Sequence, residues 1–197
     1  MPEIQYFELL DDVYRFNRWF VLEPTATAGR TIRGTEFIRG RFVEVDGGFL
    51  CQIRSSGELL DFTFADFGVP VLRRAVAQEI HRLAPRSVQL IPVEVLGSRE
   101  EFAILNVIET ADCLNESQSQ VTRWTEADGV PKLVGQYLSV LDPVVDPTRT
   151  NGSKIFRITG WLPSIVVDSD IALLLTGASG VIVRPMASGP LTDDARE

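Results

Sequence analysis

The feature that most restricts the fold of this chain is a series of short apolar segments separated by turn-forming residues, of which only two have helical spacing. Short apolar segments bounded by Gly, Pro, Asn and Asp are typical of β-strands. Successive strands with only two helices argue against a regular alternation of parallel strands and helices. The sequence therefore predicts an α+β fold, mainly antiparallel β-sheet, with a hairpin-rich N-terminal lobe and principal helices at about 70–84 and 169–176.

The clearest turn signal is the pair Asp46-Gly47, which lies between two segments of alternating apolar residues. Asp-Gly favours a type I′ turn, because both central residues of that turn need positive φ. The pattern predicts a β-hairpin over 41–54. Since strand side chains alternate between two faces, one face of the returning strand carries Phe49, Cys51 and Ile53. Cys51 is therefore interpreted as a small core residue.

The two helical segments have recognisable ends. Apolar residues recur at helical spacing after Pro70, which suits a first helical turn, and Pro85 ends the pattern. The second helix is preceded by Asp168, a favourable N-cap, and followed by Gly177. Further strands are predicted at 88–95, with Pro92 indicating an edge or a bulge, and at 102–108, 154–158, 164–167 and 180–185.

We expect an N-terminal lobe at 1–66, a C-terminal α+β lobe at 67–186 and a polar tail at 187–197. One continuous domain remains an alternative, because a chain of 197 residues can form a single core.

The charge of the chain is acidic and unevenly distributed. The formal net charge is -8, and nine acids between Glu100 and Asp146 face only Arg123 and Lys132. Because binding to a phosphate backbone needs clustered cations, nucleic acid is not an expected partner. An acidic surface can instead steer a basic protein partner, or simply keep the protein soluble.

The sequence predicts a reduced, cytoplasmic protein. No apolar run approaches the roughly 18 residues that span a bilayer, and the N-terminal segment lacks the pattern of a secretory signal. The two cysteines, Cys51 and Cys113, are too few for a disulfide framework. No membrane insertion is expected, and homo-oligomers are left open.

Motifs for catalysis are scarce. The sequence has no glycine-rich phosphate loop, no dinucleotide fingerprint and a single histidine, His81. Carboxylate pairs such as Asp142 and Asp146 are the remaining candidates for acid–base work or for a hard cation. Each of these two acids precedes a proline, which sets backbone shape without any chemistry. We therefore assign no catalytic residue, metal or cofactor, and keep a small carboxylate- or metal-dependent hydrolase as an alternative.

A long polar stretch from Asn115 to Gly135 is the best candidate for a contact surface. Connections of this length are often functional, and Trp, Tyr and Arg are enriched at binding hot spots. Alternatively, Trp124 folds back onto the core. The candidate partner-binding residues are Arg123, Trp124, Glu126, Asp128, Tyr137, Asp142 and Asp146.

Several blocks occur in a characteristic order: Phe67-Gly68-Val69-Pro70-Val71, Val88 to Val95 with Pro92, Ile104 to Leu114, Ile155-Phe156-Arg157, Val167-Asp168-Ser169-Asp170 and Gly177 to Pro185. From about Tyr6 to Met186 the chain resembles immunity-protein family eleven of bacterial polymorphic toxin systems, formerly a domain of unknown function. The resemblance rests on the order and spacing of these blocks, since each is weakly specific alone.

The resemblance implies a non-enzymatic bacterial protein, encoded near a toxin, that binds and neutralises that toxin by protein–protein interaction. It implies no catalytic residues. The sequence-based alternatives are the hydrolase described above and a regulatory module that recognises another protein.

Overall fold

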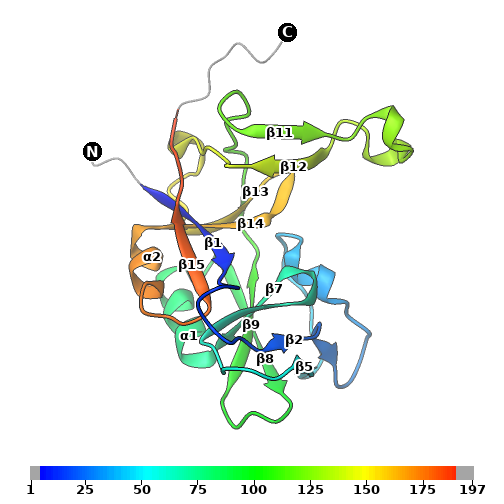
Figure 1. The fold of residues 1–197 in the computed structure, drawn as a ribbon, viewed down its shortest axis with the longest axis vertical. Helices are drawn as coiled ribbons and strands as arrows, with labels where there is room; N and C mark the ends of the chain where they lie inside the picture. Colours follow the sequence, from blue (N-terminus) through cyan, green and yellow to red (C-terminus); the bar gives the residue numbers. More distant parts are fainter. Residues whose placement is uncertain (1–4, 190–197) are drawn as a thin grey trace.

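The computed structural model describes residues 5–189, which form two principal β-sheets and two α-helices. The five-stranded sheet lies in the upper half of Figure 1 and the six-stranded sheet in the lower half. Most neighbouring strands are antiparallel, and the predicted α+β class is confirmed.

The six-stranded sheet has the order β3-β4-β8-β9-β7-β6. Its centre is the antiparallel pair β8–β9, two strands that the sequence predicted, and β4 joins β8 in parallel. A separate short pair, β2 (Phe20–Val21) with β5 (Ile53–Ser55), belongs to the same apolar cluster as residues of this sheet. The six strands are β3 (Thr25–Ala26), β4 (Phe49–Cys51), β6 (Phe62–Ala65), β7 (Val69–Arg73), β8 (Val88–Val95) and β9 (Phe102–Val107).

The five-stranded sheet has the order β10-β13-β14-β1-β15. Strand β1, close to the N-terminus, pairs antiparallel with both β14 and β15 from the C-terminal part of the chain. Only the pairing of β10 with β13 is parallel. The strands are β1 (Tyr6–Asp11), β10 (Thr110–Ala111), β13 (Ile155–Ile158), β14 (Trp161–Asp168) and β15 (Val181–Pro185).

The two helices, α1 (Arg74–Leu83) and α2 (Ser169–Leu175), pack against each other and are seen together in Figure 1. Their buried residues Ala77, Ile80 and Ile171 belong to one apolar cluster with residues of both sheets. The helices therefore help to join the sheets into a shared core, because burial of apolar surface is the main favourable contribution to folding. Asp168 caps α2 as predicted, accepting the N–H of Ile171 at 3.1 Å.

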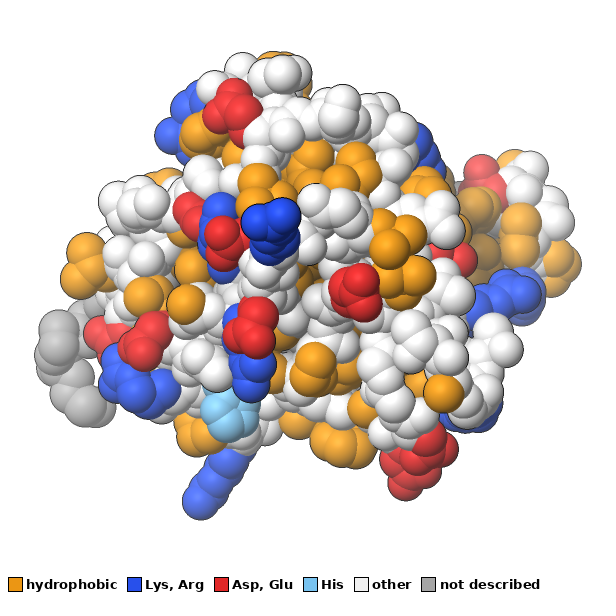
Figure 2. Space-filling view, turned by 90° about the horizontal axis from the view of Figure 1, so that it is seen from below, with side chains coloured by type: hydrophobic (Ala, Val, Ile, Leu, Met, Phe, Trp, Pro, Cys, Tyr) orange, Lys and Arg blue, Asp and Glu red, His pale blue; other side chains and the backbone are white. Residues whose placement is uncertain are grey.

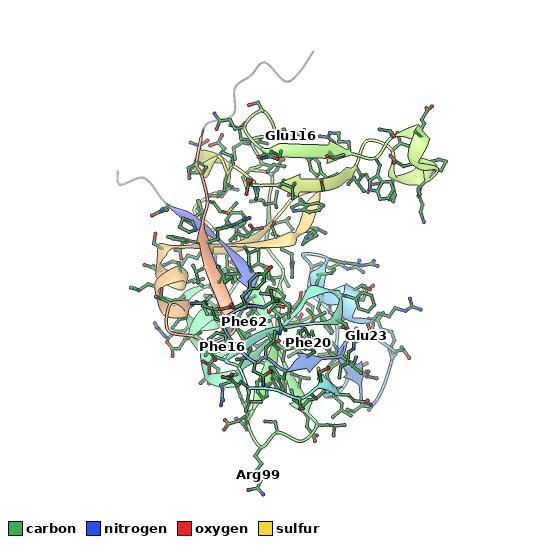
Figure 3. The ribbon with its side chains drawn as sticks, in the orientation of Figure 1. Phe16, Phe20, Glu23, Phe62, Arg99 and Glu116 are labelled. Carbon is green, nitrogen blue, oxygen red and sulfur yellow. The ribbon has the colours of Figure 1, made fainter. Side chains whose placement is uncertain are left out.

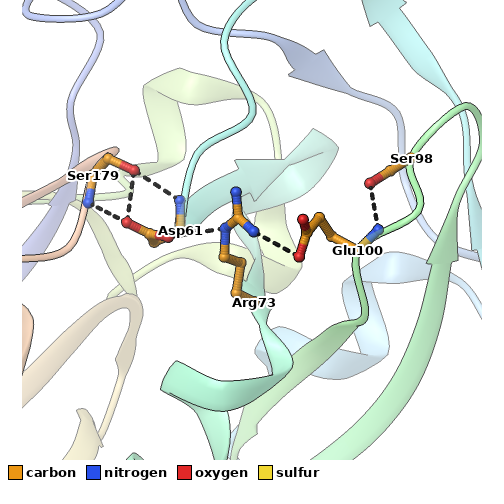
Figure 4. Close-up of polar contacts among 5 residues, drawn as sticks. All are labelled: Asp61, Arg73, Ser98, Glu100 and Ser179. Carbon is orange, nitrogen blue, oxygen red and sulfur yellow. Dashed lines mark hydrogen bonds and ion pairs between the residues drawn. The ribbon is translucent and has the colours of Figure 1, made fainter.

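A polar contact also joins the two sheets (Figure 4). The Asp61 carboxylate accepts the backbone N–H of Ser179 at 2.9 Å and its hydroxyl at 2.8 Å, while the Asp61 N–H donates to the Ser179 hydroxyl oxygen at 2.9 Å. Arg73 pairs with Asp61 at 2.9 Å and with Glu100 at 2.8 Å. The turn before β15 is thereby held against the start of β6.

The hairpin predicted over 41–54 is wrong. Residues 42–45 form no strand, and β4 pairs with β3 and β8 instead. The backbone of Val43 bonds to the side chain of Gln89 in both directions, and Asn106 donates to the Arg41 carbonyl oxygen. Side chains of the sheet thus provide the hydrogen-bond partners of this backbone segment, in place of a neighbouring strand. The predicted burial of Phe49 and Cys51 is confirmed, and Ile53 packs beside them.

The predicted start of the first helix is also wrong. Residues 70–73 belong to β7, where Val71 pairs with Thr63 on one side and Ile104 on the other. The helix begins only at Arg74, and its end at Leu83 agrees with the prediction. The apolar residues before Arg74 gain more by completing a sheet than by adding a helical turn.

Other sequence predictions hold more closely. Strands β8, β9, β13 and β15 and helix α2 are confirmed, and β14 is longer than predicted. The interpretation of Pro92 as a sign of an edge strand or a bulge is wrong, because β8 lies between β4 and β9 and its pairing with β9 is continuous. Pro92 lies next to the point where pairing with β4 begins, at Val93. Its missing N–H therefore removes no bond to β4.

Both sheets contain strands from each side of the expected lobe boundary at residues 66 and 67. The tail expected at 187–197 is described only to Gly189, and its remainder lies outside the described residues. Within the described part, no helix is long and apolar enough to span a membrane.

Candidate partner-binding site

The stretch predicted as a long polar connection contains the first strand and the tip of a two-stranded ribbon, β11 (Gln120–Arg123) with β12 (Tyr137–Leu141); the second strand begins just after that stretch. The ribbon projects away from both sheets at the upper right of Figure 1. Two further backbone bonds, Trp124 N–H to Gln136 O and Gly135 N–H to Trp124 O, each 2.9 Å, extend the pairing towards the tip. The 3₁₀ turns Glu126–Asp128 and Pro131–Leu133 close it.

A compact charge cluster lies midway along the ribbon, where Arg123 pairs with Tyr137 and both contact Glu116, which is labelled in Figure 3. The Arg123 guanidinium donates to both oxygens of Glu116 at 2.7 Å and lies 4.4 Å from the centre of the Tyr137 ring. The Tyr137 hydroxyl donates to Glu116 at 2.6 Å. Arg123 and Tyr137, both predicted as partner-binding residues, are therefore engaged with each other and with Glu116.

This cluster shifts the ionisation of its members. Burial, followed by the hydrogen bond and negative charge of Glu116, raises the pKa of Tyr137 to about 12. The hydrogen bond from Tyr137 and the nearby Arg123 lower the pKa of Glu116. Both shifts favour the arrangement in which Glu116 is charged and Tyr137 is neutral.

We expect Glu116→Gln to lower the pKa of Tyr137, because the variant removes the negative charge that opposes the phenolate while leaving the ring half-buried. The pKa is measured from the pH dependence of the ring ¹³Cζ signal in NMR, assigned with Tyr137→Phe. Glu126→Gln, at the exposed tip, is the control and should leave this pKa unchanged. An equal pKa in wild type and Glu116→Gln would contradict the role assigned to Glu116.

The tip combines apolar and acidic side chains. Trp124 is half-buried within the ribbon and belongs to none of the core clusters, whereas Glu126 and Asp128 are exposed. Asp128 accepts the Thr125 N–H at 2.7 Å and its hydroxyl at 2.8 Å, which lowers the Asp128 pKa. Figure 2 shows the tip as the projection at the right, where orange apolar side chains lie beside charged ones.

Three of the ten exposed large apolar residues in the described part of the chain lie on the second half of this ribbon. Val134 is 42%, Leu138 39% and Leu141 59% exposed. Exposed apolar residues that cluster on one element indicate a contact surface more strongly than scattered ones.

Asp142 and Asp146 have different environments. Asp142 is exposed, has a φ of 47° and lies 3.5 Å from Arg184. Asp146 is 4% exposed and accepts the N–H and the hydroxyl of Thr148 at 2.9 and 2.7 Å, capping the 3₁₀ turn Pro147–Arg149. Asp142 can reach a partner from this position, whereas the Asp146 carboxylate is enclosed by its own chain.

The side chains suited to metal or thiol chemistry are dispersed. Residues 5–189 contain no group of three or more His, Cys, Asp or Glu that could hold a metal ion. Cys51 and Cys113 are both buried, and burial raises the pKa of each thiol to about 12. Both cysteines therefore stay protonated at neutral pH, which is typical of core thiols.

Sequence reasoning missed a second group of polar residues at the root of the ribbon. Glu8 on β1, Ser164 on β14 and Arg184 on β15 meet on the sheet face that β12 partly covers. Only the alternation of side chains along β1 could have placed Glu8 on that face. No local spacing in the sequence connects Glu8 with Ser164 or Arg184.

No model of a known protein family matches this chain, and no curated protein matches it.

Proposed function

We propose that this protein is an immunity protein that binds and neutralises a cognate bacterial toxin by protein–protein contact, without catalysis. The observation that carries the proposal is the projecting ribbon β11–β12, with its exposed apolar residues beside acidic ones. The resemblance to immunity-protein family eleven supports the same function and supplies the class of partner.

The ribbon is suited to binding because its two strands are held together and its tip is accessible. The Glu116–Arg123–Tyr137 cluster holds the two strands in one arrangement, so little conformational freedom is lost when a partner binds. Trp124, Val134 and Leu138 offer apolar area, and the acids near them provide charge.

The charge suggests which surface of a toxin is covered. Acids outnumber cations along the ribbon and its flanks, and complementary charge raises the rate of association and selects the partner. A toxin that acts on a nucleic acid or another polyanion needs a basic cleft, and an acidic ribbon complements the charge of such a cleft. We propose that the complex forms in the cytoplasm of the producing cell and that the toxin is encoded by an adjacent gene.

The first test is co-purification with the product of the adjacent gene, together with rescue of growth when both are expressed. We expect a stable complex and rescue. The double variant Trp124→Ala/Glu126→Lys should then weaken binding, measured by calorimetry, by about tenfold or more, since hot-spot truncations cost at least about 1–2 kcal/mol.

The matched control is Leu173→Ala/Glu79→Lys, which changes one exposed apolar residue on α2 and one exposed acid on α1. Its affinity for the toxin should equal that of the wild type. Equal affinity of the ribbon double variant would exclude the tip as the binding surface. Absence of both complex and rescue, with both proteins folded, would refute the immunity function.

A further inference from the structure

A pocket of about 390 Å³ lies between the end of β12 and the outer face of the five-stranded sheet. This face carries the apolar cluster that includes Tyr6, Phe156 and Val140, so the base of the ribbon covers part of it. The pocket lies at the edge of the area that the ribbon covers. Its volume lies near the lower end of the range of about 300–1,000 Å³ that is usual for ligand sites, which leaves room for a single long side chain.

The floor of the pocket contains an organised polar group. Glu8 is only 5% exposed, and each of its carboxylate oxygens has a donor: the Ser164 hydroxyl at 2.6 Å and the Arg184 guanidinium at 2.5 Å. Burying a carboxylate is costly unless it is paired and hydrogen-bonded. These two donors therefore hold Glu8 in one position.

The rim adds a second carboxylate. Asp142 is 3.5 Å from Arg184, and its side chain is 72% exposed. Two carboxylates thus share one guanidinium, so the pocket has an excess of one negative charge. An anionic occupant is disfavoured because the only cation lining the pocket is already paired, while a cationic occupant can bind the accessible oxygens of Asp142.

The walls are apolar. Leu10 and Trp161 are half-buried, and Leu141 is 59% exposed on the side of the ribbon. Lysine and arginine cover apolar surface with their methylene groups while their charged ends bind a carboxylate. The indole of Trp161, next to the charged end of such a side chain, adds a favourable interaction with the cation.

We propose that this pocket receives one lysine or arginine side chain of the protein partner, with the methylene groups against Leu10, Leu141 and Trp161 and the charge at Asp142. The inference rests on the proposed function and gives the ribbon a defined anchor at its base. The charge complementarity of the pocket selects this occupant over an acidic or neutral side chain.

The pocket can be tested without any toxin. N-acetyl-arginine amide is titrated into the full chain, and the indole N–H signal of Trp161, assigned with Trp161→Phe, is followed by NMR. N-acetyl-citrulline amide, which has nearly the same shape and no charge, is the matched probe. We expect a saturable shift with the arginine probe and binding at least about fivefold weaker with the citrulline probe, as for a charge-assisted hydrogen bond.

Asp142→Asn should weaken the arginine probe about threefold or more, as expected for loss of a charge-assisted contact. Asparagine tolerates the positive φ at this position, so the backbone is preserved. Asp128→Asn at the ribbon tip is the control and should bind the probe like the wild type. Equal binding of both probes, or no saturable shift, would overturn the inference.

The toxin complex separates this inference from the proposed function. If the complex forms and Asp142→Asn weakens it, the pocket is the anchor. A complex that forms with unchanged affinity for Asp142→Asn refutes the anchor but leaves the immunity function standing. Probe binding in the absence of any toxin complex refutes the assignment of a toxin side chain to this pocket.

Discussion

Gly180→Ala should destabilise the protein by about 3 kcal/mol or more, as expected when overpacking and a positive φ act together. A Cβ at this position would lie 2.1 Å from the carbonyl oxygen of Phe62 and 2.9 Å from the Cβ of Leu60. Gly180 also has a φ of 92°, which an alanine adopts only with strain. The turn before β15 cannot move away from β6 without breaking the hydrogen bonds between Ser179 and Asp61.

The effect is measured as the free energy of unfolding in urea. Gly177→Ala, three residues earlier, is the control, because no heavy atom lies within 4 Å of the added Cβ and its φ is not positive. This control should unfold within about 1 kcal/mol of the wild type. Similar stabilities for the two variants would show that β6 and this turn are not as closely packed as described.

Arg157→Met is expected to stabilise the protein by about 1–3 kcal/mol, in the range found when buried charges are replaced by apolar residues. Arg157 is 0% exposed and, within residues 5–189, has no carboxylate partner. Its guanidinium donates to the Leu162 carbonyl at 2.5 Å and to that of Phe37 at 3.5 Å, while its Nε has no hydrogen-bond partner. Methionine fills much of the same volume without a buried charge.

The pH dependence gives an independent check. Burial lowers the pKa of Arg157 from 12.5 to about 10. Between these values the unfolded wild type binds more protons than the folded one, so its stability rises with pH in that window. The advantage of Arg157→Met should therefore be constant below pH 10 and shrink above it. Arg157→Ala, which leaves a cavity, should be less stable than Arg157→Met at every pH.

A wild type that is more stable than Arg157→Met at neutral pH would contradict this prediction. It would mean that the two carbonyl contacts of the guanidinium outweigh the cost of burying its charge. The comparison is made by guanidinium chloride unfolding, which screens other electrostatic contributions equally in both proteins.

The sequence predicted elements whose ends are marked locally. Helix α2 is bounded by Asp168 and Gly177, and the turn at Leu96-Gly97 ends β8, so local chemistry and the tertiary structure agree. Consistency between local preference and overall fold makes such elements predictable.

The failures have non-local causes. Asp46-Gly47 carries a strong hairpin signal, but the strand that follows finds its partners at 25–26 and 93–95. Likewise the helical spacing after Pro70 is overridden by pairing of β7 with β6 and β9. A strand whose partners are distant in sequence cannot be recognised from the local residue pattern alone.

The candidate site was predicted as a stretch of sequence without a structure. Sequence reasoning interpreted residues 115–135 as a connection, because the polar residues of β11 conceal the pattern of a short strand and its partner β12 lies beyond that stretch. The pocket at its base was missed, since Glu8 and Arg184 are 176 residues apart. Such groups become neighbours only through the order of the strands.

The position of β1 has a consequence for synthesis of the protein. The six-stranded sheet is built from residues 25–107 and can assemble while the rest of the chain is still being translated. Strand β1 emerges earlier, yet its partners at 166–168 and 181–185 are made last. Contacts of such large sequence separation form slowly. The nascent chain therefore carries an unpaired, largely apolar strand until translation is nearly complete, and a chaperone has its longest opportunity to bind there.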